Sequence, residues 1–340
     1  MNLLNDLSKR YLLLLASTAL LLSCGATIEM EGEAGVDPIG GDAETGNTGD
    51  TDGGDPGEGP GDTGVPPLTA EEDDGCDQID LLFVIDDSGS MGEEQSNLSV
   101  NFPAFADVIQ RFQTSTGDAI DYRLGVTTTG VSVRIRRDLA FGITIDDDQR
   151  GADGALVNGS CSGETRPWLE RNDGDIANKF SCMADVGTSG PDEEMPLEAI
   201  RRSIEDRVED GVNTDFFRED ALLGIVVLTD EDDCSTQEAR VNLGFGDDIC
   251  DDAHVVDDYV AALDGFKGER GKWATAVIAG LDNCNSALGS ARRATRLLDF
   301  SEQTGENAIT SSICEGDLAS ALQDALETFD AACRSFPPIE

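Results

Sequence analysis

The sequence is poor in positive charge and has a single histidine, His254. It contains 23 Lys and Arg against 69 Asp and Glu, which gives a formal net charge of −46 at pH 7. Such a charge argues against nucleic acid as a partner, because binding of nucleic acid depends on neutralising phosphates. It suits cations or basic partners, and it also favours solubility.

Common catalytic motifs are missing as well. There is no G-x-S-x-G elbow, no P-loop and no H-E-x-x-H. A Ser-His-Asp triad through Ser88 would need His254, which is predicted to begin a helix, to reach the end of a distant strand. A phosphoryl-transfer nucleophile of the haloacid dehalogenase type at Asp86 would need a second Asp where Ser88 stands. We therefore expect that the protein is not an enzyme.

The first 23 residues are predicted to be a signal peptide. Lys9 and Arg10 precede the apolar run YLLLLASTALLL, which is too short to span a membrane comfortably, and Ser23 and Cys24 follow it. This resembles a bacterial lipoprotein signal, in which Cys24 becomes the lipid-carrying N-terminus. The alternative is an ordinary signal peptide with a chance cysteine. Because Gly25 and not Asp follows the cysteine, the resemblance implies an exported chain on the outer membrane or cell surface, touching the membrane only through its lipid.

Residues 24–75 are predicted to be a disordered acidic linker. Residues 25 to 75 contain fifteen Asp or Glu and no Lys or Arg, set among Gly, Thr and Pro. Such a segment buries too little apolar surface to offset its ordering entropy. As a flexible coil it would span roughly 40 Å, which suits a stalk. Weak calcium binding by its Asp-Gly pairs is the alternative, but no D-x-D-x-D-G loop is complete.

Residues 76–340 are predicted to form one α/β domain. The signal contributes +1 and the stalk −15 to the total of −46, which leaves −32 for this domain. Continuous apolar runs are typical of parallel strands covered on both faces, and they occur at 79–85, 122–128, 222–228 and 273–279. Two further strands are expected, an antiparallel edge strand at 139–145 and a short last strand at 307–313.

Apolar stripes at spacings of three and four predict helices between these strands. The stripes cover 98–112, 197–208, 256–266 and 318–329. Alternating strands and helices favour a doubly wound, mostly parallel sheet with helices on both faces. Ligands of such sheets sit beyond the carboxyl ends of the strands, where the strand order reverses. With the usual order, the first and fourth strands are neighbours there, which brings Asp86 and Asp230 together.

Eight cysteines remain besides Cys24, and an even number in an exported chain implies disulfides. None stands in a C-x-x-C pair, which disfavours a zinc site or thioredoxin-type chemistry. Eight cysteines allow 105 connectivities. Proximity favours Cys161 with Cys182 and Cys234 with Cys250, and the remaining four could pair as Cys76 with Cys333 and Cys284 with Cys314.

The stretch LLFVIDDSGSMGEEQ carries the main candidate site. Asp86, Ser88 and Ser90 fit D-x-S-x-S, in which alternate side chains can point to one centre. Their oxygens are hard ligands that suit Mg²⁺, Mn²⁺ or Ca²⁺. The stretch resembles the first motif of the von Willebrand factor type A domain, whose metal-ion-dependent adhesion site also takes a Thr and an Asp from two other loops. Asp230, in VVLTDEDD, matches the third motif.

The sequence departs from this family in two places. Glu231 stands where Gly is common, and the second motif is unclear. In VGTSGPDEEMPLEAI, either Thr188 or Glu194 could supply the remaining ligand. Glu194 would add negative charge and weaken the pull of the ion on an outside carboxylate. An insertion at roughly 131–190 precedes this loop and is expected to form part of the rim.

The resemblance implies a domain that binds a protein partner, whose acidic side chain completes the coordination of a divalent ion. The alternatives are an ion that only pins loops together, an empty relic of a site, and a structural or calcium-responsive envelope component without a carboxylate ligand. A second, calcium-type ion could bind the acidic loop between Cys234 and Cys250, although such acids are often solvated loop edges. Its candidate ligands are Asp232, Asp233, Asp247, Asp248, Asp251 and Asp252.

Overall fold

The computed structural model describes residues 75–113, 117–157, 163, 165–286, 289–316 and 318–336. The predicted signal peptide, Cys24 and the acidic linker lie outside the described residues, as does Cys161. Within the described part of the chain, no helix combines the length and the apolar character needed to cross a membrane.

A six-stranded sheet forms the centre of the fold, with its strands in the order β11-β8-β6-β1-β2-β5. All neighbours are parallel except β5, which runs antiparallel to β2 at the edge. The predicted α/β fold class is confirmed, and so is the pairing of the first strand with the strand at 222–228. The strands are β1 (Gln78–Ile85), β2 (Asp121–Thr128), β5 (Trp168–Glu170), β6 (Leu222–Leu228), β8 (Trp273–Ala279) and β11 (Ala308–Ser312).

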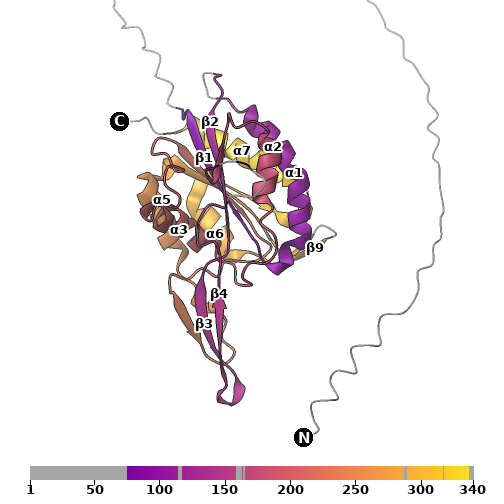
Figure 1. The fold of residues 1–340 in the computed structure, drawn as a ribbon, viewed down its shortest axis with the longest axis vertical. Helices are drawn as coiled ribbons and strands as arrows, with labels where there is room; N and C mark the ends of the chain where they lie inside the picture. Colours follow the sequence, from indigo (N-terminus) through magenta and orange to yellow (C-terminus); the bar gives the residue numbers. More distant parts are fainter. Residues whose placement is uncertain are drawn as a thin grey trace, which may run out of the picture. The chain divides into compact units, whose positions relative to one another are not determined.

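Helices cover both faces of this sheet (Figure 1). Side chains of β1 alternate between two apolar cores, with Phe83 in one and Val84 in the other, which explains why the strand is continuously apolar from Leu81 to Ile85. The first face carries α1 (Gly92–Gln110), α2 (Ile176–Ala184) and α7 (Leu318–Arg334). The second carries α3 (Pro196–Ile204), α5 (Val256–Lys267) and α6 (Thr295–Thr304).

One helix prediction needs correction, and two helices were not predicted. The stripe at 197–208 is not one helix, because α3 ends at Ile204 and a separate short helix, α4 (Asp206–Glu209), follows. No apolar stripe was found in the sequence for α2 or α6. Only Leu297, Phe300, Ser301 and Thr304 of α6 are buried, so its apolar stripe is too weak to read.

A second sheet projects away from the first and has the order β4-β3-β7 (Figure 1). It comprises β3 (Val133–Asp138), β4 (Thr144–Gln149) and β7 (Arg240–Leu243). The prediction of a main-sheet edge strand at 139–145 is therefore wrong. Its apolar residues form the exposed tip of the β3–β4 hairpin, and β5 is the antiparallel edge strand of the main sheet. A small antiparallel pair, β9 (Cys284–Ser286) and β10 (Gly289–Ala291), completes the strands.

Three of the four predicted disulfides are present. The bonds join Cys76 to Cys333, Cys234 to Cys250 and Cys284 to Cys314. Cys182 is also disulfide-bonded. Its predicted partner, Cys161, lies outside the described residues, so that pairing stays a prediction. The Cys76–Cys333 bond joins the segment just before β1 to the end of α7, across a sequence separation of 257.

Removing the Cys76–Cys333 bond is expected to destabilise the chain more than removing Cys284–Cys314, whose sequence separation is 30. Each disulfide closes a loop and so lowers the conformational entropy of the unfolded chain. Removing it is therefore expected to lower the free energy of unfolding, by about 5 kcal/mol for Cys76–Cys333 and about 3.5 kcal/mol for Cys284–Cys314. The measurement is urea unfolding of the two Cys→Ser double variants. A larger loss for the Cys284 and Cys314 variant would contradict this ranking.

Candidate metal centre

The ends of β1 and β6 bring two predicted site residues together. Asp86 follows β1, and its backbone N–H donates to the carbonyl of Leu228, the last residue of β6, at 2.9 Å. Thr229 then places its hydroxyl 2.6 Å from Asp86 Oδ2, to which it donates. Both side chains are fully buried. The adjacent strand ends thus join the first and third motifs through direct contacts.

The two serines extend this contact to Asp230. The Ser88 backbone N–H donates to Asp86 Oδ1 at 2.8 Å, and the Ser88 and Ser90 hydroxyls lie 2.9 Å apart. Ser90 Oγ donates to Asp230 Oδ1 at 3.0 Å. Ser88 and Asp230 are buried, whereas Ser90 is exposed, so the cluster opens to solvent at Ser90. The four predicted residues therefore form one continuous polar cluster.

Of the two second-motif candidates, Glu194 belongs to this cluster. Glu194 is only 2% exposed and interacts electrostatically with Asp86 and Asp230, whereas Thr188 is exposed. The loop is held by backbone bonds from Met195 N–H to the Thr129 carbonyl at 3.2 Å and from Cys234 N–H to the Glu194 carbonyl at 2.8 Å. These long-range bonds turn Glu194 inward.

The carboxyl groups of the cluster resist ionisation. Burial, together with the charges of Asp86 and Glu231, raises the pKa of Glu194 far above its ordinary value. Burial and the charge of Asp86 raise the pKa of Asp230 to about 7. The pKa of Asp86 is also raised by burial, against the hydrogen bond from Thr229. Several acids thus share one site in which each disfavours the charge of the others.

Three contributors to the site were not among the predicted ligands. Thr229 holds Asp86 directly, and Gln95 Nε2 donates to the Asp86 carbonyl at 2.9 Å. Glu94, on the first turn of α1, is 2% exposed, and burial raises its pKa. The position of Thr229, next to Asp230, was a usable signal. Glu94 had none, because acids are ordinary in the first turn of a helix.

The donor set suits a hard divalent cation. Carboxylate and hydroxyl oxygens are the groups that Mg²⁺, Mn²⁺ and Ca²⁺ prefer. Within the described residues, Glu194 Oε1 and Glu94 Oε2 are buried and accept no hydrogen bond. Buried carboxylate oxygens normally have a partner, so these two oxygens fit the ligands of a bound cation.

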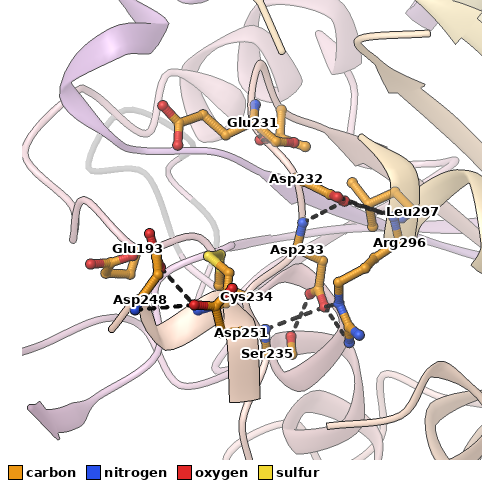
Figure 2. The surroundings of a disulfide bond; sticks show 12 residues. Glu193, Glu231, Asp232, Asp233, Cys234, Ser235, Asp248, Asp251, Arg296 and Leu297 are labelled. Carbon is orange, nitrogen blue, oxygen red and sulfur yellow. Dashed lines mark hydrogen bonds and ion pairs between the residues drawn. A yellow bond between two sulfur atoms is a disulfide. The ribbon is translucent and has the colours of Figure 1, made fainter. Parts of the chain in front are cut away.

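The acidic loop expected to hold a second ion is used for structure. Figure 2 shows Asp232 and Asp233 turned toward Arg296. Asp232 accepts from the backbone of Arg296 at 2.9 Å, at the start of α6, and Asp233 accepts from Leu197 N–H at 3.1 Å, at the start of α3. Their carboxylates satisfy helix N-termini, which accounts for them without an ion.

The other acids of this loop fit the same interpretation. Asp248 and Asp251 form a reciprocal capping box on the short helix Ile249–Asp252, beside the disulfide in Figure 2. Asp247 accepts from Gly244 N–H at 2.9 Å, and Asp252 is exposed. The structure therefore gives no support to a second ion bound by these side chains.

Glu193, Cys234 and Cys250 also lie close together, with their donor atoms within 4.8 Å of one another. The two sulfurs are joined in a disulfide, so neither is a thiolate that could bind a metal. The Glu193 carboxylate instead pairs with Arg137 at 2.5 Å. This group is therefore not a metal site.

Comparisons with known proteins give matches to solved structures only at low identity and low TM-score. No family model matches the sequence, and no curated protein matches it. Proximal thread matrix protein 1 from the mussel byssus matches with 12% identity and a TM-score of 0.41, over 75% of this chain and 49% of the mussel protein. Manganese-loaded TRAP protein of Plasmodium vivax matches with 12% identity and a TM-score of 0.33, over 74% of each chain. The pilus adhesin of Streptococcus pneumoniae matches with 11% identity and a TM-score of 0.25, over 46% of this chain and 21% of the adhesin.

The chain thus spans about half the length of the mussel protein. Because these TM-scores are all below 0.5, the fold assignment rests on the strand order of the central sheet.

When a chelator keeps the protein free of metal, its free energy of unfolding is expected to fall as the pH rises from 5 to 8. Asp230, whose folded pKa is raised from 3.8 to about 7, keeps its proton in the folded state where the unfolded chain has released it. Asp230 therefore lowers the free energy of unfolding by at most about 3 kcal/mol across this window. Glu194 acts in the same direction, and an added divalent ion should reverse the loss at pH 8.

The test is urea unfolding at both pH values, with Glu194→Gln and the control Glu302→Gln, an exposed residue of α6. Glu194→Gln should raise stability at pH 8 and flatten the pH dependence. Equal behaviour of the two variants would contradict the assignment.

Proposed function

We propose that this domain is a metal-dependent protein-binding module of the von Willebrand factor type A kind. The observation that supports the proposal is the continuous hydrogen-bonded path from Asp86 through Ser88 and Ser90 to Asp230, at the ends of two adjacent parallel strands. Glu194, buried beside this path with an unsatisfied oxygen, completes the set. Mg²⁺ is the proposed ion, with Mn²⁺ or Ca²⁺ as alternatives.

The proposed roles follow from the hydrogen bonds already made. Ser88 and Ser90 would hold the ion through their hydroxyls. Both oxygens of Asp86 accept hydrogen bonds, from Ser88 N–H and Thr229. Asp86 would therefore contribute negative charge to the site and interact with the ion through water. Asp230 and Glu194 would supply carboxylate oxygens. The exposed side of the cluster, at Ser90, leaves access for a group of the partner.

The number of carboxylates limits what the ion can attract. Asp86, Asp230 and Glu194 together carry three negative charges when ionised, which exceeds the two positive charges of the ion. An acidic side chain of the partner would therefore be held weakly. This gives specific support to the second candidate, a structural or calcium-responsive envelope component, because a carboxylate-rich shell suits Ca²⁺.

We propose binding and not catalysis. His254 precedes α5, and its Nε2 lies 2.6 Å from Oδ2 of Asp258 in the first turn of that helix, while its ring contacts Tyr259. The Ser88 hydroxyl contacts Ser90. These partners favour a structural histidine over a general base for Ser88.

We also propose the location that the N-terminal sequence predicts. Lipid attached at Cys24 would hold the chain at the outer membrane or cell surface, and residues 24–75 would form the stalk. The domain would then bind its protein partner outside the membrane, since the lipid is the only proposed contact with the membrane.

Isothermal titration of the full chain with Mg²⁺, Mn²⁺ and Ca²⁺ is expected to show one ion bound at the cluster. Ser88→Ala should weaken binding by about tenfold or more, because it removes one ligand of the ion. Ser335→Ala is the matched control. Its hydroxyl bonds only the end of α7, next to Cys333, at the opposite end of β1 from the cluster.

Each pattern of results separates the candidates. Binding of all three ions with loss in Ser88→Ala supports the adhesion-type site. Binding of Ca²⁺ alone favours the envelope component. If Ser88→Ala binds as the wild type does, the proposed site is wrong.

A further inference from the structure

The β3–β4 hairpin ends in an apolar tip that covers nothing in the described chain. Of the eight large apolar side chains that are exposed among the described residues, five lie at this end of the small sheet. Phe141 is 100% exposed and Phe245 73%. The set, which we name the hairpin tip, is Leu139, Phe141, Ile143, Ile145 and Phe245.

The register of the small sheet gathers these residues at one end. β3 and β4 pair from Val133 with Gln149 up to Asp138 with Thr144, so residues 139–143 form the turn. β7 runs parallel to β3 and pairs Leu243 with Arg137, which places Phe245 beyond the same end. Figure 1 shows the hairpin pointing away from the main sheet.

The base of the hairpin is fixed, whereas its tip is free. Val133, Ile135 and Leu243 are buried in the core that α3 and α5 cover. Arg137 pairs with Glu193, the residue before Glu194, at 2.5 Å. The hairpin is thus a projection whose base is anchored beside the candidate metal centre.

The turn presents Phe141 to solvent at a conformational cost. Phe141 has φ 65° and ψ 22°, in the left-handed region that a bulky residue rarely adopts, and the Leu139 N–H closes the turn onto the Ile143 carbonyl at 2.6 Å. Backbone strain of this kind persists where the surrounding structure imposes it, and it clusters at functional sites. Exposed apolar patches of this kind mark interaction sites.

The charges around the tip decide what can cover it. Asp138, Asp146, Asp147, Asp148 and Asp247 are all exposed on the strands and loop that border it. The exposed arginines of β3, Arg134 and Arg136, lie opposite Asp148 and Asp146 in the hairpin, so the border keeps an excess of negative charge. A second copy of the chain would bring another domain with a net charge of −32 against this border, and an anionic lipid surface would be repelled in the same way. A protein with an apolar pocket and a basic rim satisfies both the apolar tip and its acidic border.

We propose that the hairpin tip inserts into an apolar pocket, rimmed by Lys and Arg, on a protein partner. This contact needs no metal ion. It goes beyond the metal-dependent binding proposed above and stands or fails separately from it.

The test uses the full chain in EDTA, so that the metal site plays no part. The probes are two amphipathic helical peptides with the same Leu-rich face, one with Lys and one with Glu on the polar face. Fluorescence anisotropy gives their affinities for the wild type, for Phe141→Ser, and for the control Val212→Ser. Val212 is 46% exposed and lies in the loop before β6, away from the tip.

Phe141→Ser is expected to weaken binding of the Lys peptide by about tenfold, since it removes one buried aromatic side chain from the contact. Val212→Ser should leave the affinity unchanged, and the Glu peptide should not bind. The proposal is overturned if Phe141→Ser binds the Lys peptide as tightly as the wild type. It is also overturned if Phe141 is instead required for binding of anionic phospholipid vesicles, or for self-association in sedimentation.

Discussion

The constraint on which the site depends is the burial of several carboxyl groups at the ends of two parallel strands. Asp86, Asp230 and Glu194 are each at most 4% exposed, and their charges oppose one another. The hydroxyls of Thr229 and Ser90, with the Ser88 N–H, satisfy only part of them. Either protons or a cation must neutralise the remainder. A cation at this point is the proposal that the motif suggests, and protonation is the competing means of neutralisation.

Much of the central sheet could be predicted because its strands are buried on both faces. The runs at 222–228 and 273–279 match β6 and β8 to the residue, since no polar alternation blurs their ends. The strand order then follows from general rules of doubly wound sheets, and it brings Asp86 beside Asp230 without reference to any motif.

Other features could not be read because long-range contacts fix them. The choice between Thr188 and Glu194 depends on how the backbone bonds of Met195 and Cys234 turn one loop. The apolar run at 139–145 resembles a buried strand, but it lies at the exposed tip of a hairpin whose second strand, TIDDDQ, is too acidic to read as one. An apolar run predicts that its side chains will be buried, but these side chains are exposed and are not covered by any other part of the described chain.

The central claim is that one hard cation lies between the ends of β1 and β6. Crystals grown with Mn²⁺ and measured at the manganese absorption edge would locate it directly. The account predicts one anomalous peak within bonding distance of the Ser88 and Ser90 hydroxyls, beside Asp230 and Glu194. A peak found only in the acidic loop between Cys234 and Cys250, or no peak at the strand ends with Mn²⁺ in excess, would contradict it.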